Sequence, residues 1–226
     1  MKKQLTTVII TVFCLLLIDQ IIKLWIKSYC IQGEIPTPLL GDWFQLHYIE
    51  NPGMAFGTTF GSSIWHKLAL SIFRIIAIVG IGYYIWTELK KNVKTDFLIA
   101  VGLIFAGAIG NLIDSAFYDY LFTFDPCNFY NQMEGSGNFI KCTHPGANGL
   151  TYETVQEVRH HGFLLGNVVD MFQFNVTWPS WVPWVGESQV FPAIWNFADA
   201  CITCGVGMIV VRNRTYFPKE KKQSEA

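Results

Sequence analysis

Four aspartates lie within or beside apolar stretches of this 226-residue chain, and they are Asp19, Asp114, Asp170 and Asp199. An ionisable group inside a membrane-spanning helix costs on the order of 3 kcal/mol, so each of them needs a reason to be there. Two carboxylates that share one proton can activate a water molecule and protonate a leaving group, because close like charges separate their pKa values. Acid–base hydrolysis is therefore the chemistry to consider.

Some of these acids have polar neighbours at helical spacing. Lys23 follows Asp19 by four residues, so the two share a helix face and could form an ion pair that is only a structural clasp. Asn111 precedes Asp114 by three residues, and this pair could be polar glue between helices. Asp199 stands deep in an apolar stretch, where a lone acid favours a functional role.

The composition points to lipid as the solvent of much of the chain. Hydrophobic residues make up 51% and charged residues 15%, against about 25% charged in soluble domains. Four stretches are long and apolar enough to cross a bilayer, and they cover residues 5–26, 64–86, 96–118 and 190–211. The first is a retained helix rather than a signal peptide, because no small-residue cleavage site follows it. We expect an all-α integral membrane protein with one domain over residues 1–226.

The basic residues predict the orientation of these helices. Ten of the 16 lysines and arginines flank the predicted spans on one side, and they are Lys2, Lys3, Lys90, Lys91, Lys94, Arg212, Arg214, Lys219, Lys221 and Lys222. This side is therefore cytoplasmic, with both termini, and residues 27–63 and 119–189 lie outside. The four aspartates then gather in the outer half of the membrane, with Asp199 about 13 Å into the fourth span.

The outer regions carry a few local signals. Alternation over residues 43–49 predicts a short strand that ends in an Asn-Pro-Gly turn. A short helix is expected around residues 152–161, and the tryptophans of residues 178–184 are typical of a membrane-interface belt.

Cys127 and Cys142 could form a disulfide, but a third outer cysteine, Cys30, leaves the pairing open. The tail, residues 219–226, is polar.

Neither a metal ion nor a nucleic acid is expected as a ligand. The five histidines have no convincing metal-ligand spacing, and the net charge of −1 comes with no basic face for nucleic acid. A transporter or channel would use the same acids to relay protons or bind cations, but it usually has repeated halves, which are absent from this sequence. A non-catalytic assembly factor is a further alternative.

Five sequence blocks, in this order, resemble the lipoprotein signal peptidases (signal peptidase II). The blocks are Asp19–Lys23, residues 51–57 (NPGMAFG), residues 107–114 (GAIGNLID), residues 168–170 (VVD), and Phe191 followed by residues 196–199 (NFAD). Each block alone is weak evidence for this family, whereas the order of the blocks, combined with the four predicted spans, is specific for it.

The resemblance implies an intramembrane aspartyl endopeptidase of the bacterial inner membrane, with its active site toward the outer, periplasmic face. It would cut prolipoproteins immediately before a diacylglyceryl-modified cysteine. Asp170 and Asp199 would be catalytic, supported by Asp19, Lys23, Asn51, Gly53, Asn111, Asp114 and Asn196. The resemblance implies no cofactor or metal. Lipid and the lipidated precursor would be the partners of a monomer with a small extracytoplasmic β-rich cradle.

Two departures from the family pattern stand out. Ser115 occupies the position after Asp114 where the family usually has arginine, and Arg74 or Arg159 could supply the missing charge. Residues 116–165 form an insert that places Asp170 much farther from Asp114 than is usual in the family. The insert must bulge outward if Asp170 is to reach the site.

Overall fold

The computed structural model describes residues 1–53, 61–146 and 149–218. Its contacts divide the chain into two compact units. The first comprises Met1–Ile21, Ile76–Gly110 and Phe197–Ala226, and the second comprises Ile22–Ile75 and Asn111–Asn196. Residues 54–57 of the predicted NPGMAFG block and the predicted polar tail lie outside the described residues.

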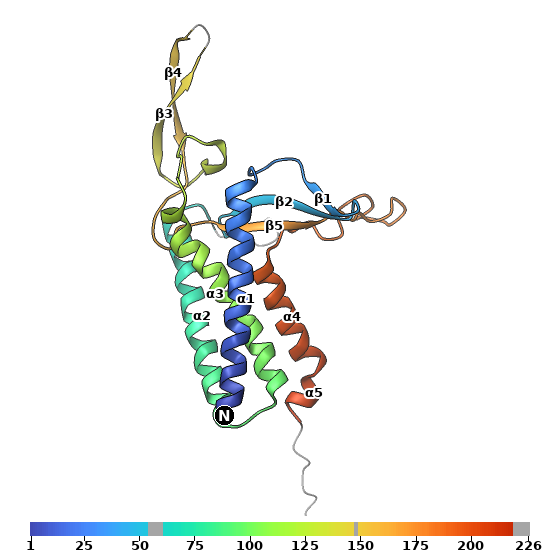
Figure 1. Ribbon diagram of the computed structural model, residues 1–226. Coiled ribbons are helices and arrows are strands. Elements are labelled where there is room, and N and C mark those ends of the chain that lie inside the picture. The colour runs from blue at the N-terminus through green and yellow to red at the C-terminus, as the bar shows by residue number, and fades with distance from the viewer. Residues whose placement is uncertain (54–60, 147–148, 219–226) are drawn as a thin grey trace, which may run out of the picture. The chain divides into compact units, whose positions relative to one another are not determined.

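In the part of the chain that the structure describes, three helices are long and apolar enough to cross a membrane (Figure 1). They are α1 (Lys2–Tyr29), α2 (Ile64–Lys90) and α3 (Thr95–Leu121), and they confirm the first three predicted spans with ends a few residues longer. At 1.5 Å per residue each exceeds the roughly 30 Å of a hydrocarbon core. Large apolar side chains such as Phe13, Phe73 and Val79 are exposed along α1 and α2, as lipid-facing positions should be.

The fourth predicted span begins later than expected. The apolar helix α4 (Phe197–Val211) has 15 residues and is followed by the short α5 (Asn213–Tyr216). Residues 190–196, predicted as its first two turns, are not helical. Trp195 instead forms an antiparallel bridge with Phe172, which holds this segment extended beside β5. The prediction that Asp199 lies deep within a helix is therefore wrong, because it stands in the first turn of α4.

A three-stranded antiparallel sheet in the second unit has the order β1-β2-β5. Its strands are β1 (Thr37–Leu40), β2 (Phe44–Asn51) and β5 (Val168–Phe174), so the predicted strand before the Asn-Pro-Gly turn is confirmed. Side chains of β2 and β5 pack with those of α1 and α3 in one buried cluster, which includes Ile26, Tyr48, Tyr118, Val169 and Met171. The sheet is thus anchored to the two helices through apolar contacts.

The insert forms a hairpin rather than the predicted helix around residues 152–161. After the short 3-10 helix η1 (Phe129–Asn131), strands β3 (Phe139–Pro145) and β4 (Thr151–Glu157) pair along their whole length (Figure 1). The β-branched and aromatic residues of β4 suit a strand, and pairing with β3 outweighs any local helical preference. The disulfide joins Cys127 to Cys142, while Cys30 is free, which resolves the open pairing.

Candidate active site

Asp170 is the third residue of β5, and the sequence explains why this carboxylate is buried. The first four residues of the strand, Val168 to Met171, are all buried, as expected of a strand that is covered on both faces. Asp170 is opposite Ile49 of β2 in the sheet register and is only 2% exposed. A carboxylate removed from water in this way requires hydrogen-bond donors.

Two asparagine amides supply those donors from different parts of the second unit. The side chain of Asn51, the last residue of β2, donates to Oδ2 of Asp170 at 2.9 Å. The side chain of Asn196 donates to Oδ1 at 2.6 Å and is itself fully buried. Hydrogen bonds to both oxygens stabilise the ionised form of a carboxylate and fix its plane.

The polar contacts continue from Asn196 to α1 and α3. The amide nitrogen of Asn196 lies 3.1 Å from Oδ1 of Asn111, which also accepts from Nζ of Lys23 at 2.9 Å. Lys23 forms an ion pair of 2.8 Å with Asp114, and neither side chain is exposed. These side chains satisfy one another, as buried charges must.

Asp114 closes this network into a ring. Its Oδ2 accepts the backbone N–H of Val169 at 3.1 Å, so the lysine-bound carboxylate holds the residue just before Asp170. We call the buried side chains of Lys23, Asn111, Asp114, Asp170 and Asn196, together with Asn51, the polar ring. Six predicted site residues from separate segments thus meet within one unit.

Gly53, also predicted at the site, acts through its backbone. Its N–H donates to Oδ1 of Asn51 at 2.9 Å, which leaves the amide nitrogen of Asn51 directed at Asp170. Gly53 has φ = +106°, and a β-carbon there would lie 2.4 Å from the side chain of Leu70. The left-handed conformation favours glycine, whereas the side chain of Leu70 could shift to make room for a β-carbon.

Asp19 and Asp199 belong to the first unit. Oδ1 of Asp19 accepts the backbone N–H of Ala198 at 3.0 Å, at the first turn of α4, where free N–H groups favour a carboxylate. Gln20 donates to the other oxygen at 3.0 Å. Asp19, 2% exposed, therefore holds the turn of α4 that carries Asp199, whose side chain is half-buried.

The two arginines considered for the Ser115 position have different partners. Arg74 of α2 donates to Oγ of Ser115 at 2.8 Å, so a guanidinium does stand beside this serine. Arg159 instead binds Asp119 through two N–H groups, at 2.9 and 3.1 Å, and this pair is buried. Asp119 also accepts the N–H of Gly162, so the two ends of the insert are joined at their base.

A polar stripe on α2 was not predicted from the sequence. Lys67, Ser71 and Arg74 are spaced by four and three residues and so share a face of a mostly apolar helix. Lys67 donates to Asn167, and Ser71 donates to the carbonyl of Leu164 at 2.7 Å. The stripe binds the segment that leads into β5, and its helical spacing could have revealed it.

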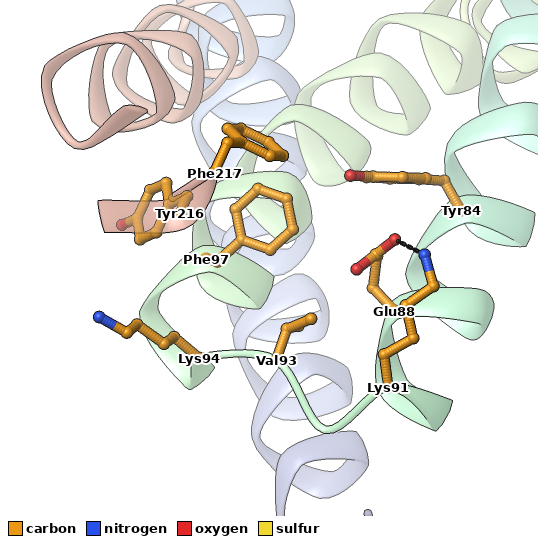
Figure 2. A pocket seen from close by; sticks show the side chains of 8 residues that line it. All are labelled: Tyr84, Glu88, Lys91, Val93, Lys94, Phe97, Tyr216 and Phe217. Atoms are coloured by element: carbon orange, nitrogen blue, oxygen red, sulfur yellow. Dashed lines mark hydrogen bonds and ion pairs between the residues drawn. The ribbon is translucent and has the colours of Figure 1, made fainter. Parts of the chain in front are cut away.

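A different cavity, of about 400 Å³, lies in the first unit between the end of α2, the start of α3 and the end of α5 (Figure 2). Its charged side chains are Glu88, Lys91 and Lys94, with aromatic rings of Tyr84 and Phe97 beside them. Of the nine residues predicted at the site, none lines it. It is not a candidate active site.

Comparison with known proteins gives a consistent result. The family model described as signal peptidase (SPase) II matches residues 11–214. A lipoprotein signal peptidase of Porphyromonas gingivalis is 40% identical over 87% of this chain and 78% of its own length. One from Amoebophilus asiaticus is 33% identical, over 92% and 78% of the two chains.

A solved bacterial membrane enzyme is similar in fold. Its structure has a TM-score of 0.57 and 21% sequence identity, over 96% of this chain and 94% of that one. At this identity the likeness concerns the fold alone.

Proposed function

The chain belongs to the signal peptidase II family, and we propose that Asp170 and Asp199 are the carboxylates with which it cleaves its substrate. Membership makes it a lipoprotein signal peptidase, an aspartic endopeptidase that removes signal peptides from prolipoproteins. The observation that carries the residue assignment is the buried carboxylate of Asp170, whose two oxygens accept hydrogen bonds from two separate asparagines.

The chemistry requires one proton shared by the two carboxyl groups. The ionised carboxylate takes a proton from water while the protonated partner donates its own proton to the scissile carbonyl, which gives a tetrahedral gem-diol. The carboxyl group that gained the proton of water then donates it to the leaving amine as the C–N bond breaks, and its partner takes a proton back from the gem-diol. Each of the two carboxyl groups therefore acts once as an acid and once as a base in a turnover. The amides of Asn51 and Asn196 stabilise negative charge on Asp170.

Asp19 and Asp114 have supporting roles in this proposal. Asp19 fixes the first turn of α4 through the N–H of Ala198, and Asp114 fixes β5 through the N–H of Val169. Asn196 donates to Asp170 and precedes Asp199 by three residues, which also favours a joint role for the two aspartates. Lys23 and Asn111 hold Asp114 and Asn196 in turn.

The membrane arrangement is part of the proposal. α4 would be a fourth, shorter span, both termini would be cytoplasmic, and the β1-β2-β5 sheet would be the cradle on the outer side. The signal helix of the precursor would then enter laterally from the lipid, and the bond before the diacylglyceryl cysteine would reach Asp170 near the outer face. One chain suffices for all these groups, so the enzyme would act as a monomer.

The test is cleavage of a diacylglyceryl-modified precursor by purified variants, followed by gel shift. Asp170→Asn and Asp199→Asn keep the size of each side chain but remove its acid–base function, and loss of such a group costs on the order of 10²–10⁴-fold in rate. Asp42→Asn is the matched control, because Asp42 is exposed at the turn before β2. We expect it to cleave like the wild type.

Thermal unfolding of each variant in detergent shows whether the fold is retained. The assignment of the pair fails if the folded double variant cleaves at the wild-type rate. Loss of activity in only one of the two single variants would assign the chemistry to that aspartate with a different partner.

A further inference from the structure

A cavity of about 330 Å³ in the second unit has no role in the chemistry described above. Its walls come from the end of β2, the start of α2 and the insert, and they include Gly53, His66, Lys67, Met133, Arg159 and Asn167. This volume falls at the lower end of the range for small-ligand pockets, about 300–1,000 Å³. It is large enough for a few residues of extended peptide.

Two of the four carboxylate, ammonium and guanidinium groups in the described lining of this cavity are already neutralised. Glu50 forms an ion pair with Lys27 and accepts the hydroxyl of Tyr48 at 2.9 Å. Arg159 is held by Asp119. These groups have little to offer an incoming ligand, because a bound charge would have to replace an existing partner.

Lys67 and the exposed Glu134 are the two charges of the described lining without an ion pair, and Lys67 is the less exposed of the two. Its ammonium donates to the amide oxygen of Asn167, and no described carboxylate forms an ion pair with it. A partly buried ammonium with only a neutral partner gains most from an anion that can reach it. Glu134, the remaining acid of the wall, is exposed.

The cavity is linked to Asp170 on two sides. Gly53, which lines it, donates to Asn51, and Asn51 donates to Asp170. Asn167, the partner of Lys67, precedes Asp170 by three residues in the segment leading into β5. A peptide whose scissile bond lies at Asp170 can therefore continue into this cavity over a short distance.

We propose that this cavity binds the residues that follow the lipidated cysteine, and that Lys67 selects precursors with an acidic side chain there. The proposal rests on the function proposed above, because that segment is the polar part of the precursor outside the membrane. The cavity suits peptide better than lipid. In the described lining, the apolar groups of Pro52, Leu70, Tyr130 and Met133 alternate with charged and amide side chains, whereas acyl chains need a continuous apolar groove.

The experiment compares pairs of lipidated precursors that differ only in two residues after the cysteine, as Asp/Glu or as the matching Asn/Gln. We expect the wild type to cleave the acidic precursor with about tenfold higher kcat/KM, mainly through a lower KM, since the contact does not change during the reaction. Lys67→Gln should abolish this preference, and Lys67→Arg should keep most of it. Lys141→Gln, at an exposed lysine of β3, is the matched control and should behave like the wild type.

A charge reversal sharpens the test. Lys67→Glu should invert the preference, so that a precursor with lysines after the cysteine is cleaved best. Glu134→Gln removes the other charge of the wall that has no described ion pair, and it should raise the preference for the acidic precursor.

Four outcomes would overturn the proposal. If the wild-type enzyme cleaved the acidic and the neutral precursor with equal kcat/KM, the cavity would not recognise their charge. If Lys67→Gln kept the preference for the acidic precursor, another residue would recognise the charge. If Lys67→Gln slowed both precursors equally, Lys67 would only hold Asn167. If cleavage of the neutral precursor rose with the fraction of anionic lipid and lost that response in Lys67→Gln, the ligand would be a lipid headgroup. Failure to cleave any precursor would instead contradict the proposed function.

Discussion

The polar ring around Asp170 and the cavity of Figure 2 contain similar residue types but differ in how those residues are held. The ring buries its ion pair, Lys23–Asp114, completely, and its carboxylates accept hydrogen bonds from amides. In the cavity, Lys91 pairs with Glu88 while its own side chain is 64% exposed. Nearby, Arg212 and Asp96 form another partly exposed pair.

This difference in the burial of ion pairs distinguishes the polar ring from a cavity at the surface. Exposed ion pairs contribute about 0–1 kcal/mol, so charged residues collect at helix ends without any particular task. A buried ion pair is retained only if its desolvation is offset by a complete set of partners, and leaving one partner alone is strongly destabilising. Burial with full hydrogen bonding therefore distinguishes the polar ring, where we place the proposed active site, from this cavity.

The largest difference between the two regions is expected when one lysine is removed from each of them. Lys23→Met leaves Asp114 buried without its cation, and we expect a loss of about 3–5 kcal/mol in the free energy of unfolding, together with loss of activity. Lys91→Met is the matched control and should cost less than about 1 kcal/mol. Unfolding in detergent measures both, and similar losses would refute the contrast.

The disulfide tests whether the polar ring depends on the insert. Cys127→Ser opens a loop with a sequence separation of 15, for which the chain-entropy model gives about 3 kcal/mol. Because none of the ring residues lies within this loop, turnover by the folded protein should stay near the wild-type value. An inactive variant with normal melting would show that the hairpin takes part in the reaction.

Two glycines of the first unit also differ in how closely other atoms pack against them. A β-carbon at Gly107 of α3 would lie 2.3 Å from the carbonyl oxygen of Ala198, so Gly107→Ala should destabilise by about 1–3 kcal/mol. Gly80 of α2 has nothing within 4 Å of such an atom. Gly80→Ala should therefore stabilise by up to about 1 kcal/mol, through helix propensity. Equal melting shifts in the two variants would contradict the close approach.

The smallest effect is expected from an exposed carboxylate of the hairpin. The backbone N–H groups of Gly137 and Gly135 donate to Glu157 and lower its pKa from the ordinary 4.5. The ionised form is favoured in the folded state, so its contribution is present above pH 4.5 and is lost as the pH falls through the lower, folded pKa. Glu157→Gln should melt with a slightly weaker acid dependence, while Glu153→Gln on the same strand should match the wild type.

Local patterns predicted the parts of the fold that local physics decides. Alternation was sufficient for β2, and the apolar flanks of Asp170 correctly indicated a buried acid. The strand β4 was mistaken for a helix because its pairing with β3 is not visible in its own residues. The start of α4 was misplaced because Trp195 pairs with Phe172, a contact between distant parts of the sequence.

Partners of buried charges were harder to predict than the charges themselves. The spacing of Asp19 and Lys23 on one helix did not reveal that Lys23 forms an ion pair with Asp114 on another helix. The spacing of residues could not choose between Arg74 and Arg159 for Ser115, and tertiary packing brings Arg74 to it. Such choices depend on which helices meet, and that information is distributed over the whole chain.

The pairing of β2 with β5 also has a consequence for how the protein is made. Asn51 and Asp170 are 119 residues apart, so Asn51 leaves the ribosome on the order of ten seconds before its partner, at about 5–20 residues per second. Throughout this time β2 can pair only with β1, and Lys23 must wait for Asp114 as well. The polar ring is therefore among the last parts of the chain to assemble, and under the proposed assignment a chain gains its activity only after Asn196 has been synthesised.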